Sequence, residues 1–277
     1  YADMWQYAEV YMDAGVPYYN VFWDFKALAH VYSGKVIAQP TCTAYGKTKY
    51  TCTQCCDSYS VANIKPKGHS YKSQLTKATT AKDGQTYKKC TVCGAVTGKT
   101  VIPKASNIKL SKTAYTYNGK VQRPGVTVKN SKGKALKNGT DYTVSYPKGM
   151  KNVGKYTVKV TLKGNYSGSK SMTYNINPKG TSVSKVTAAK KGFKVTWKKQ
   201  ATQITGYQVQ YSTSSKFKSA KTVTISKNKT TSKSVNKLSA KKKYYVRVRT
   251  YKTVKIGGKS VKLYSGWSKA KSVTTKK

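Results

Sequence analysis

The chain has 277 residues, enough for two or three domains of ordinary size, and its formal net charge at neutral pH is +47. No carboxylate side chain follows Asp141, so the C-terminal half cannot form the paired carboxylates used in general acid–base catalysis or in many metal sites. No apolar run approaches the ~20 residues that a membrane helix requires, and we therefore expect no membrane span.

The positive charge rises along the chain. Net charge is −3 over residues 1–34, +10 over 35–104, +14 over 105–179 and +26 over 180–277. Of the 54 basic residues only three are Arg, the side chain suited to bidentate base contacts, so sequence-specific nucleic-acid binding is not expected. The charge favours weak, multivalent association with anionic cell-wall polymers or glycans. The alternative is a solvated surface on which Lys provides solubility.

Residues 1–34 are predicted to be the end of an upstream domain. Apolar residues recur at roughly helical spacing from Trp5 to Ala14, Gly15 supplies a helix stop, and Pro17 prevents continuation. An extended piece is predicted over residues 18–25. This helix–Gly–Val–Pro–strand unit resembles the end of a leucine-rich repeat in surface proteins of gut bacteria; an unrelated domain tail is the alternative. Because the chain begins at Tyr1 without a signal peptide, we expect it to be the C-terminal part of a longer protein.

All six cysteines lie in residues 35–104, which contain two related units. The pair Cys52-x2-Cys55 recurs 38 positions later as Cys90-x2-Cys93. The first unit also has a leading Cys42 and a terminal Gly-His69, neither of which recurs in the second. These units resemble small cysteine repeats of surface proteins from Gram-positive anaerobes, although Cys56 stands where those repeats usually have Gly.

Spacing alone leaves three roles open for these cysteines. A Cys-x2-Cys pair can direct both sulfurs at one ion, so structural zinc is the first role. Disulfides are the second, because an exported protein readily forms them, and idle thiols are the third. Zinc or disulfides would cross-link a segment with few large aliphatic residues, and no other cofactor is expected. Two zinc groupings fit the spacing: Cys42, Cys52, Cys55 and His69, or Cys52, Cys55, Cys90 and Cys93.

A catalytic role for the cysteines is not expected. A redox Cys-x-x-Cys pair belongs at a helix start within an α/β unit, and nothing in the sequence predicts one here. A Cys/His nucleophile pair that used His69 or His30 would need an orienting acid, and the nearby acids are few. We predict no catalytic residue in this chain.

Residues 105–179 alternate Thr, Val and Tyr with Gly, Asn and Pro breaks, which predicts short strands. Period-2 alternation from Tyr156 to Leu162 places apolar residues on one face of a half-buried sheet. The run from Gly139 to Tyr146, together with residues 153–168, resembles bacterial immunoglobulin-like modules, which implies a β-sandwich.

Residues 180–277 have the most complete strand pattern. Leu238 precedes Tyr244 by six positions, and Val246 and Val248 then follow at period 2. With Trp197 at the end of an earlier alternating run, this resembles a fibronectin type III domain. The resemblance implies structural roles for Trp197, Leu238 and Tyr244, with the Tyr244 hydroxyl bonded back to the backbone near the preceding turn.

We therefore predict a mainly β chain of tandem sandwiches, preceded by a cysteine-stapled module and a short helical fragment. The predicted function is that of extracellular spacer and adhesion modules of a secreted or cell-surface bacterial protein, monomeric and non-catalytic. The alternative is the accessory tail of a secreted glycoside hydrolase or peptidase. The predicted divisions are 1–34, 35–104, 105–179 and 180–277.

Overall fold

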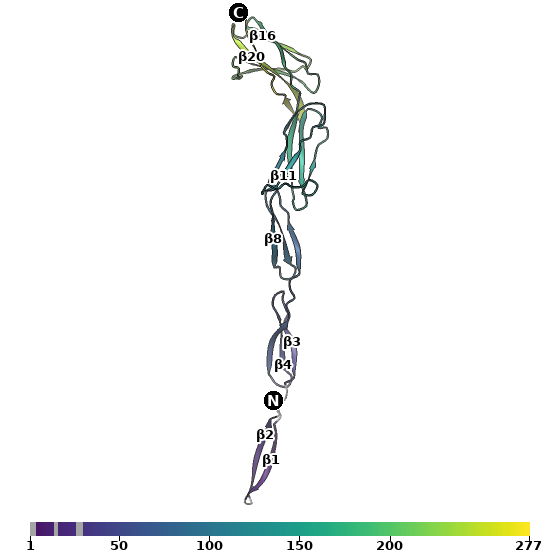
Figure 1. Cartoon of the computed structure of the whole chain (residues 1–277), viewed down its shortest axis with the longest axis vertical. Coiled ribbons are helices and arrows are strands. Elements are labelled where there is room, and N and C mark those ends of the chain that lie inside the picture. The colour runs from purple at the N-terminus through teal and green to yellow at the C-terminus, as the bar shows by residue number, and fades with distance from the viewer. Residues whose placement is uncertain (1–3, 14–15, 26–29) are drawn as a thin grey trace. The chain divides into compact units, whose positions relative to one another are not determined.

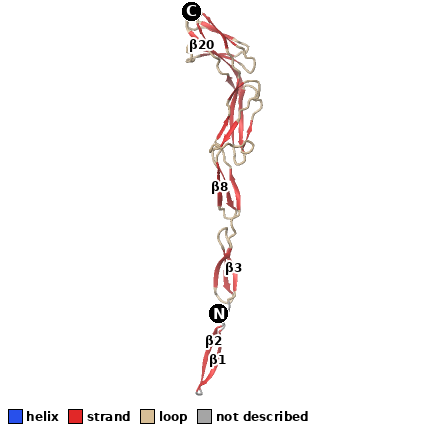
Figure 2. Ribbon diagram, viewed as in Figure 1, coloured by secondary structure: helices blue, strands red, loops and turns tan. Residues whose placement is uncertain are grey.

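The computed structural model describes residues 4–13, 16–25 and 30–277, with side chains from residue 30 onward. Strands and loops make up these residues, and none of them is helical (Figures 1 and 2). The chain divides into two compact units, residues 1–74 with 86–100 and residues 75–85 with 101–277. This division is coarser than the four predicted segments. The predicted class, mainly β with tandem sandwiches, is confirmed.

The predicted helix between Trp5 and Ala14 is wrong. Strands β1 (Met4–Asp13) and β2 (Val16–Phe25) pair antiparallel over their full length, from Met4 opposite Phe25 to Asp13 opposite Val16. Aromatic and β-branched residues are common in both segments and favour strands, while β2 supplies the hydrogen-bonding partner that spacing within β1 could not reveal. The predicted helix stop, Gly15, lies outside the described residues.

Two small three-stranded sheets follow, one for each cysteine unit. Their strand orders are β3-β4-β5 and β6-β7-β8. Most of their side chains are exposed, and the buried hydrophobic side chains between residues 30 and 104 are Cys42, Cys52, Ala78 and Cys90. The strands are β3 (Tyr32–Ala38), β4 (Gly46–Cys52), β5 (Ser58–Ile64), β6 (Tyr71–Thr76), β7 (Gly84–Cys90) and β8 (Val96–Ile102).

The next module is a sandwich of a four-stranded sheet, β10-β14-β13-β12, and a two-stranded sheet, β11-β9. Alternation along β13 buries Val158, Val160 and Leu162, as the period-2 pattern predicts, and leaves Tyr156 half-buried. Ala78, from the second cysteine unit, belongs to the same core. The strands are β9 (Asn107–Leu110), β10 (Ala114–Thr116), β11 (Val126–Lys129), β12 (Tyr142–Ser145), β13 (Gly154–Leu162) and β14 (Ser169–Asn177).

The C-terminal module is a second sandwich, with sheets β15-β16-β19 and β18-β17-β20-β21, to which β22 adds by pairing with β20. Trp197 and Tyr244 are buried in its core, and Leu238 packs against that core partly buried. The Tyr244 hydroxyl accepts a hydrogen bond from the Ser239 backbone N–H at 3.4 Å. The strands are β15 (Val183–Ala189), β16 (Gly192–Trp197), β17 (Gly206–Ser212), β18 (Lys221–Ile225), β19 (Ser232–Val235), β20 (Lys243–Ile256), β21 (Lys259–Tyr264) and β22 (Lys271–Thr274).

Candidate metal centres and cationic surface

One cluster of possible metal ligands contains Cys42, His69, Cys90 and Cys93, whose ligand atoms all lie within 4.8 Å of one another. The Sγ atoms of Cys42 and Cys90 are 3.8 Å apart, and Cys93 Sγ is 3.3 Å from His69 Nδ1. Cys42 lies in the loop between β3 and β4, and His69 lies two residues before β6. Cys90 ends β7, and Cys93 lies in the turn that leads to β8.

A second cluster contains His30, Cys52 and Cys55. His30 Nδ1 is 3.4 Å from Cys52 Sγ and 3.3 Å from Cys55 Sγ. Its placement repeats that of the first cluster, since His30 precedes β3, Cys52 ends β4 and Cys55 lies in the turn that follows. The exposed Cys56 belongs to neither cluster.

The same backbone contacts position both Cys-x2-Cys turns. The Thr53 N–H donates to the Val31 carbonyl at 2.8 Å, and the Thr91 N–H donates to the Ser70 carbonyl at 2.9 Å. Each contact fixes a cysteine turn beside the residue that follows a cluster histidine. The turn and the histidine therefore meet because of strand pairing within each unit.

The structure groups the ligands differently from both sequence-based groupings. Cys42 and His69 lie with Cys90 and Cys93, whereas Cys52 and Cys55 lie with a histidine to which no ligand role was assigned. A sequence signal for that histidine existed, because His30-Val-Tyr32 recurs as His69-Ser-Tyr71. The repeat therefore begins at the histidine, and the His-x-Tyr motif opens each unit.

Backbone N–H groups favour the thiolate form at one cysteine of each turn. Donation from the Cys93 backbone holds the pKa of Cys90 at about 5, and donation from the Gln54 backbone holds that of Cys52 at about 6. Burial instead raises the pKa of Cys42 to about 11. The thiolate is the form of cysteine that binds metal ions, and the lowered pKa values of Cys52 and Cys90 favour that form.

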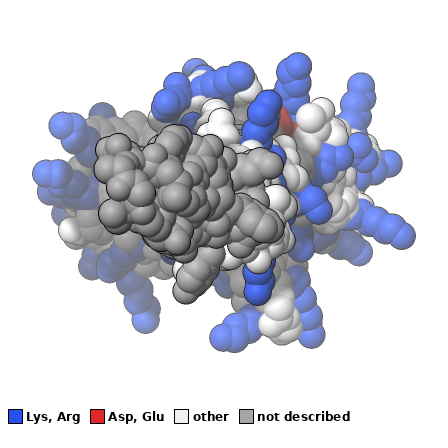
Figure 3. Space-filling view, turned by 90° about the horizontal axis from the view of Figure 1, so that it is seen from below, with Lys and Arg blue, Asp and Glu red and all other residues white. Residues whose placement is uncertain are grey.

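Lysines cover much of the described surface. None of the buried side chains in residues 30–277 is Lys or Arg. On the face that Figure 3 presents, Lys and Arg side chains project outward with little acidic surface between them. Burying an unpaired ammonium is prohibitively costly, so these charges stay in water, where they can meet a polyanion.

The outer face of the C-terminal module carries an aromatic–arginine stack that the sequence analysis missed. Alternation along β20 puts Val246 and Val248 into the core and Arg247 and Arg249 outside. The guanidinium carbons lie 4.8 Å (Arg247) and 4.3 Å (Arg249) from the centre of the Trp267 ring. The outer faces of the stack are closed by Phe217 and Tyr264, each 3.8 Å from its arginine.

Two glutamines of β17 hold the arginines of this stack. Arg247 Nε donates to Gln210 Oε1 at 2.8 Å, and Arg249 Nε donates to Gln208 Oε1 at 2.9 Å. Trp267, which both arginine side chains contact, is half-buried. A sequence signal was present, because the only arginines of the module alternate on one strand and the glutamines alternate on its neighbour.

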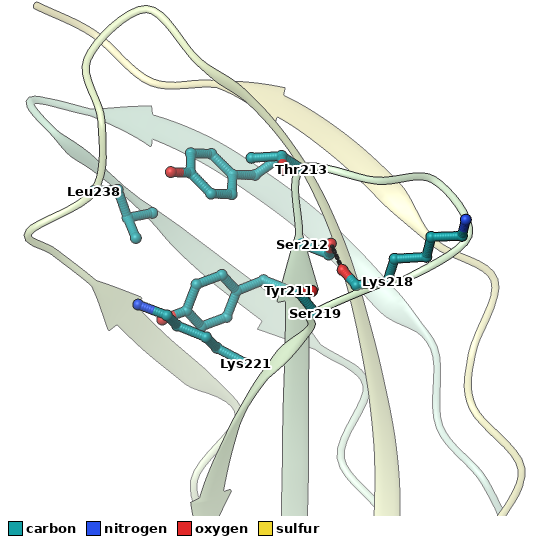
Figure 4. Close-up of a pocket in the computed structure, with 8 residues that line it drawn as sticks. Tyr211, Ser212, Thr213, Lys218, Ser219, Lys221 and Leu238 are labelled. Carbon is teal, nitrogen blue, oxygen red and sulfur yellow. Dashed lines mark hydrogen bonds between the residues drawn. The ribbon is translucent and has the colours of Figure 1, made fainter.

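A cavity of about 190 Å³ opens at one end of this module (Figure 4). Tyr211, Tyr244 and Leu238 line it together with Ser212, whose hydroxyl donates to the Lys218 carbonyl at 2.7 Å. Neither a carboxylate nor a histidine is among its lining residues.

Comparisons with known proteins agree with part of this description. Residues 177–265 match the fibronectin type III domain family, so a domain of this type, a non-catalytic binding or spacer module, is present. No curated protein matches the chain.

Among solved structures, the FN1–FN3 domains of chicken CNTN1 are 13% identical, with 90% of this chain and 99% of that chain covered and a TM-score of 0.32. Domains A168–A170 of titin are 15% identical, with 91% and 100% covered and a TM-score of 0.25. Scores this low carry no argument beyond the family match.

Proposed function

We propose that the chain provides non-catalytic spacer and adhesion modules of a secreted or cell-surface bacterial protein. It associates loosely with anionic wall polymers or glycans through its lysines. The observation that carries this proposal is the unburied positive charge: the net charge is +47, and no Lys or Arg is buried among residues 30–277. Fibronectin type III domains are common in extracellular proteins, which supports the location.

The form of the charge indicates which contacts to expect. Lys presents a compact, strongly hydrated ammonium on a flexible stem, which neutralises anionic groups without fixing their geometry. The two arginines of the C-terminal module, which could make bidentate contacts, are already held by glutamines and aromatic rings. The surface therefore attracts phosphate- or carboxylate-rich polymers without selecting among them.

A test compares binding to immobilised teichoic-type polyphosphate polymer, to a carboxylated glycan and to a neutral glycan of similar length. We expect similar retention on both anionic polymers at low salt and none on the neutral one. Acetylation removes the lysine charges and should abolish retention on both. Binding to the neutral glycan, or retention that survives acetylation, would instead indicate a shaped site and overturn the proposal.

The described residues include no helix long and apolar enough to cross a membrane.

A further inference from the structure

We propose that Cys42, His69, Cys90 and Cys93 bind one zinc ion and that this ion joins the two cysteine units. The first unit supplies Cys42, and the second supplies the other three ligands. The inference is independent of polyanion binding, because none of these four side chains belongs to the lysine surface.

The spacing of the donor atoms fits a tetrahedral ion. With Zn–S bonds of ~2.3 Å and a Zn–N bond of ~2.0 Å, two sulfur ligands lie ~3.8 Å apart, and a sulfur and a nitrogen lie ~3.5 Å apart. The Cys42–Cys90 Sγ separation is 3.8 Å, and the Cys93 Sγ to His69 Nδ1 distance is 3.3 Å. A disulfide needs ~2.05 Å between sulfurs and gives the imidazole no role.

The donor type selects the metal. Three thiolates and one imidazole suit zinc, whereas calcium and magnesium prefer the oxygen ligands that this cluster lacks. Cys42 and Cys90 are buried, with exposed fractions of 6% and 2%. The bound ion would therefore lie in the interior of the module and stabilise it as a hydrophobic core would. Large apolar side chains of these units, such as Val36, Ile37 and Val101, are exposed and cannot supply that core.

Backbone hydrogen bonds already place the Cys42 loop beside the start of the second unit. The Lys67 N–H donates to the Thr41 carbonyl at 2.9 Å, and the Gly68 N–H donates to the Cys42 carbonyl at 3.1 Å. Zinc bound to Cys42 and His69 would fix the segment between them. The metal therefore controls how firmly one unit is held to the next.

The repeat pattern accounts for two irregularities. Thr80 takes the place of Cys42 in the second unit, where an immunoglobulin-like module follows and no further His-x-Tyr motif supplies the other ligands. For the His30, Cys52 and Cys55 cluster, the same rule requires a cysteine before residue 30, and residues 1–29 contain none. Within residues 1–277 we therefore expect one tight, four-ligand zinc site and one weaker, three-ligand site.

The test uses the full chain, reduced and stripped of metal, then titrated with Zn²⁺ or with Co²⁺ as a spectroscopic probe. We expect one equivalent to bind tightly, with the visible bands of tetrahedral thiolate-bound Co²⁺. Cys42→Ser should weaken that equivalent by ~100-fold or more. Cys55→Ser and the matched control Cys56→Ser should leave it unchanged.

Tryptic cleavage after Lys67 reports the link between the two units separately from metal affinity. Trypsin does not cleave the neighbouring bond after Lys65, because Pro66 follows it. Zinc should slow cleavage after Lys67 in the wild type and in Cys56→Ser but not in Cys42→Ser. The proposal is overturned if the wild type binds neither ion tightly, or if its untreated form carries disulfides between these cysteines. If Cys42→Ser still binds zinc tightly, the ion does not join the two units. The same conclusion follows if zinc does not change the rate of cleavage after Lys67 in the wild type.

Discussion

The guanidinium carbon of Arg249 lies 3.8 Å from the centre of the Tyr264 ring, at one end of a stack that continues through Trp267 to Arg247 and Phe217. Both arginines keep their charge at neutral pH and point away from the core. The stack places aromatic rings against the guanidinium groups on the outer face of the sheet. Side-chain hydrogen bonds and ring contacts together fix the geometry of both arginines in this stack.

We predict that replacing both arginines by lysine destabilises residues 177–277 by ~2 kcal/mol, although the net charge is unchanged. Lysine keeps the charge but loses the planar face and the paired donors to Gln208 and Gln210. Urea unfolding of the fragment measures this, with Lys259→Arg as a charge-conserving control on the exposed surface. An unchanged midpoint in the double variant would mean that the stack contributes nothing to stability.

The fragment 177–277 should unfold cooperatively on its own, because its core is drawn from its own strands. Within it, Tyr244→Phe removes the acceptor of the Ser239 N–H and should cost ~1 kcal/mol. Tyr245→Phe, on the neighbouring position of β20 but outside the core, is the matched control. Non-cooperative unfolding of the wild-type fragment, or equal midpoints for the two variants, would contradict this account.

Gly206→Ala should disrupt the pairing of β17 with β18. A Cβ at Gly206 would lie 1.9 Å from the Ile225 carbonyl oxygen. This oxygen belongs to the backbone and cannot move without loss of the hydrogen bonds between β17 and β18. We expect a loss of ~3 kcal/mol or more. Gly266→Ala, where no atom lies within 4 Å, should be nearly neutral. Similar stability of the two variants would show that the strand edge adapts.

Stability of the sandwich formed by strands β9 to β14 should fall at alkaline pH. Burial raises the pKa of Tyr174 from 10.0 to about 12, so the folded state prefers the protonated phenol. Its contribution is complete below pH 10 and is lost as the pH rises toward 12. Tyr174→Phe, which also removes the hydrogen bond to the Gln122 carbonyl, should lower stability at neutral pH but flatten this alkaline fall. Parallel pH profiles for the two proteins would contradict the assignment.

The sequence predicts some features of this fold well and others not at all. Period-2 alternation placed Val158, Val160, Val246 and Val248 in cores, because one buried face is a local property of a strand. The N-terminal hairpin was missed because the same apolar residues satisfy helical spacing until the partner strand is considered.

The candidate metal site was predicted only in its residue types. Which cysteines share an ion depends on which strand ends meet, and spacing along the chain does not determine that. The repeated His-x-Tyr motif carried the missing information, because it marks where each unit begins. The arginine stack was missed for a related reason, since its members come from different strands and loops.

The salt dependence of polyanion binding tests the central claim most directly. Affinities of the full chain for DNA and for a wall-type polyphosphate should be measured by titration from low salt to ~1 M, where exposed charges are screened beyond ~3 Å. The account predicts a linear fall of log affinity with log salt on both polymers, with little discrimination between them. Tight binding to one polymer that persists at ~1 M salt would contradict it, because a shaped site would then exist.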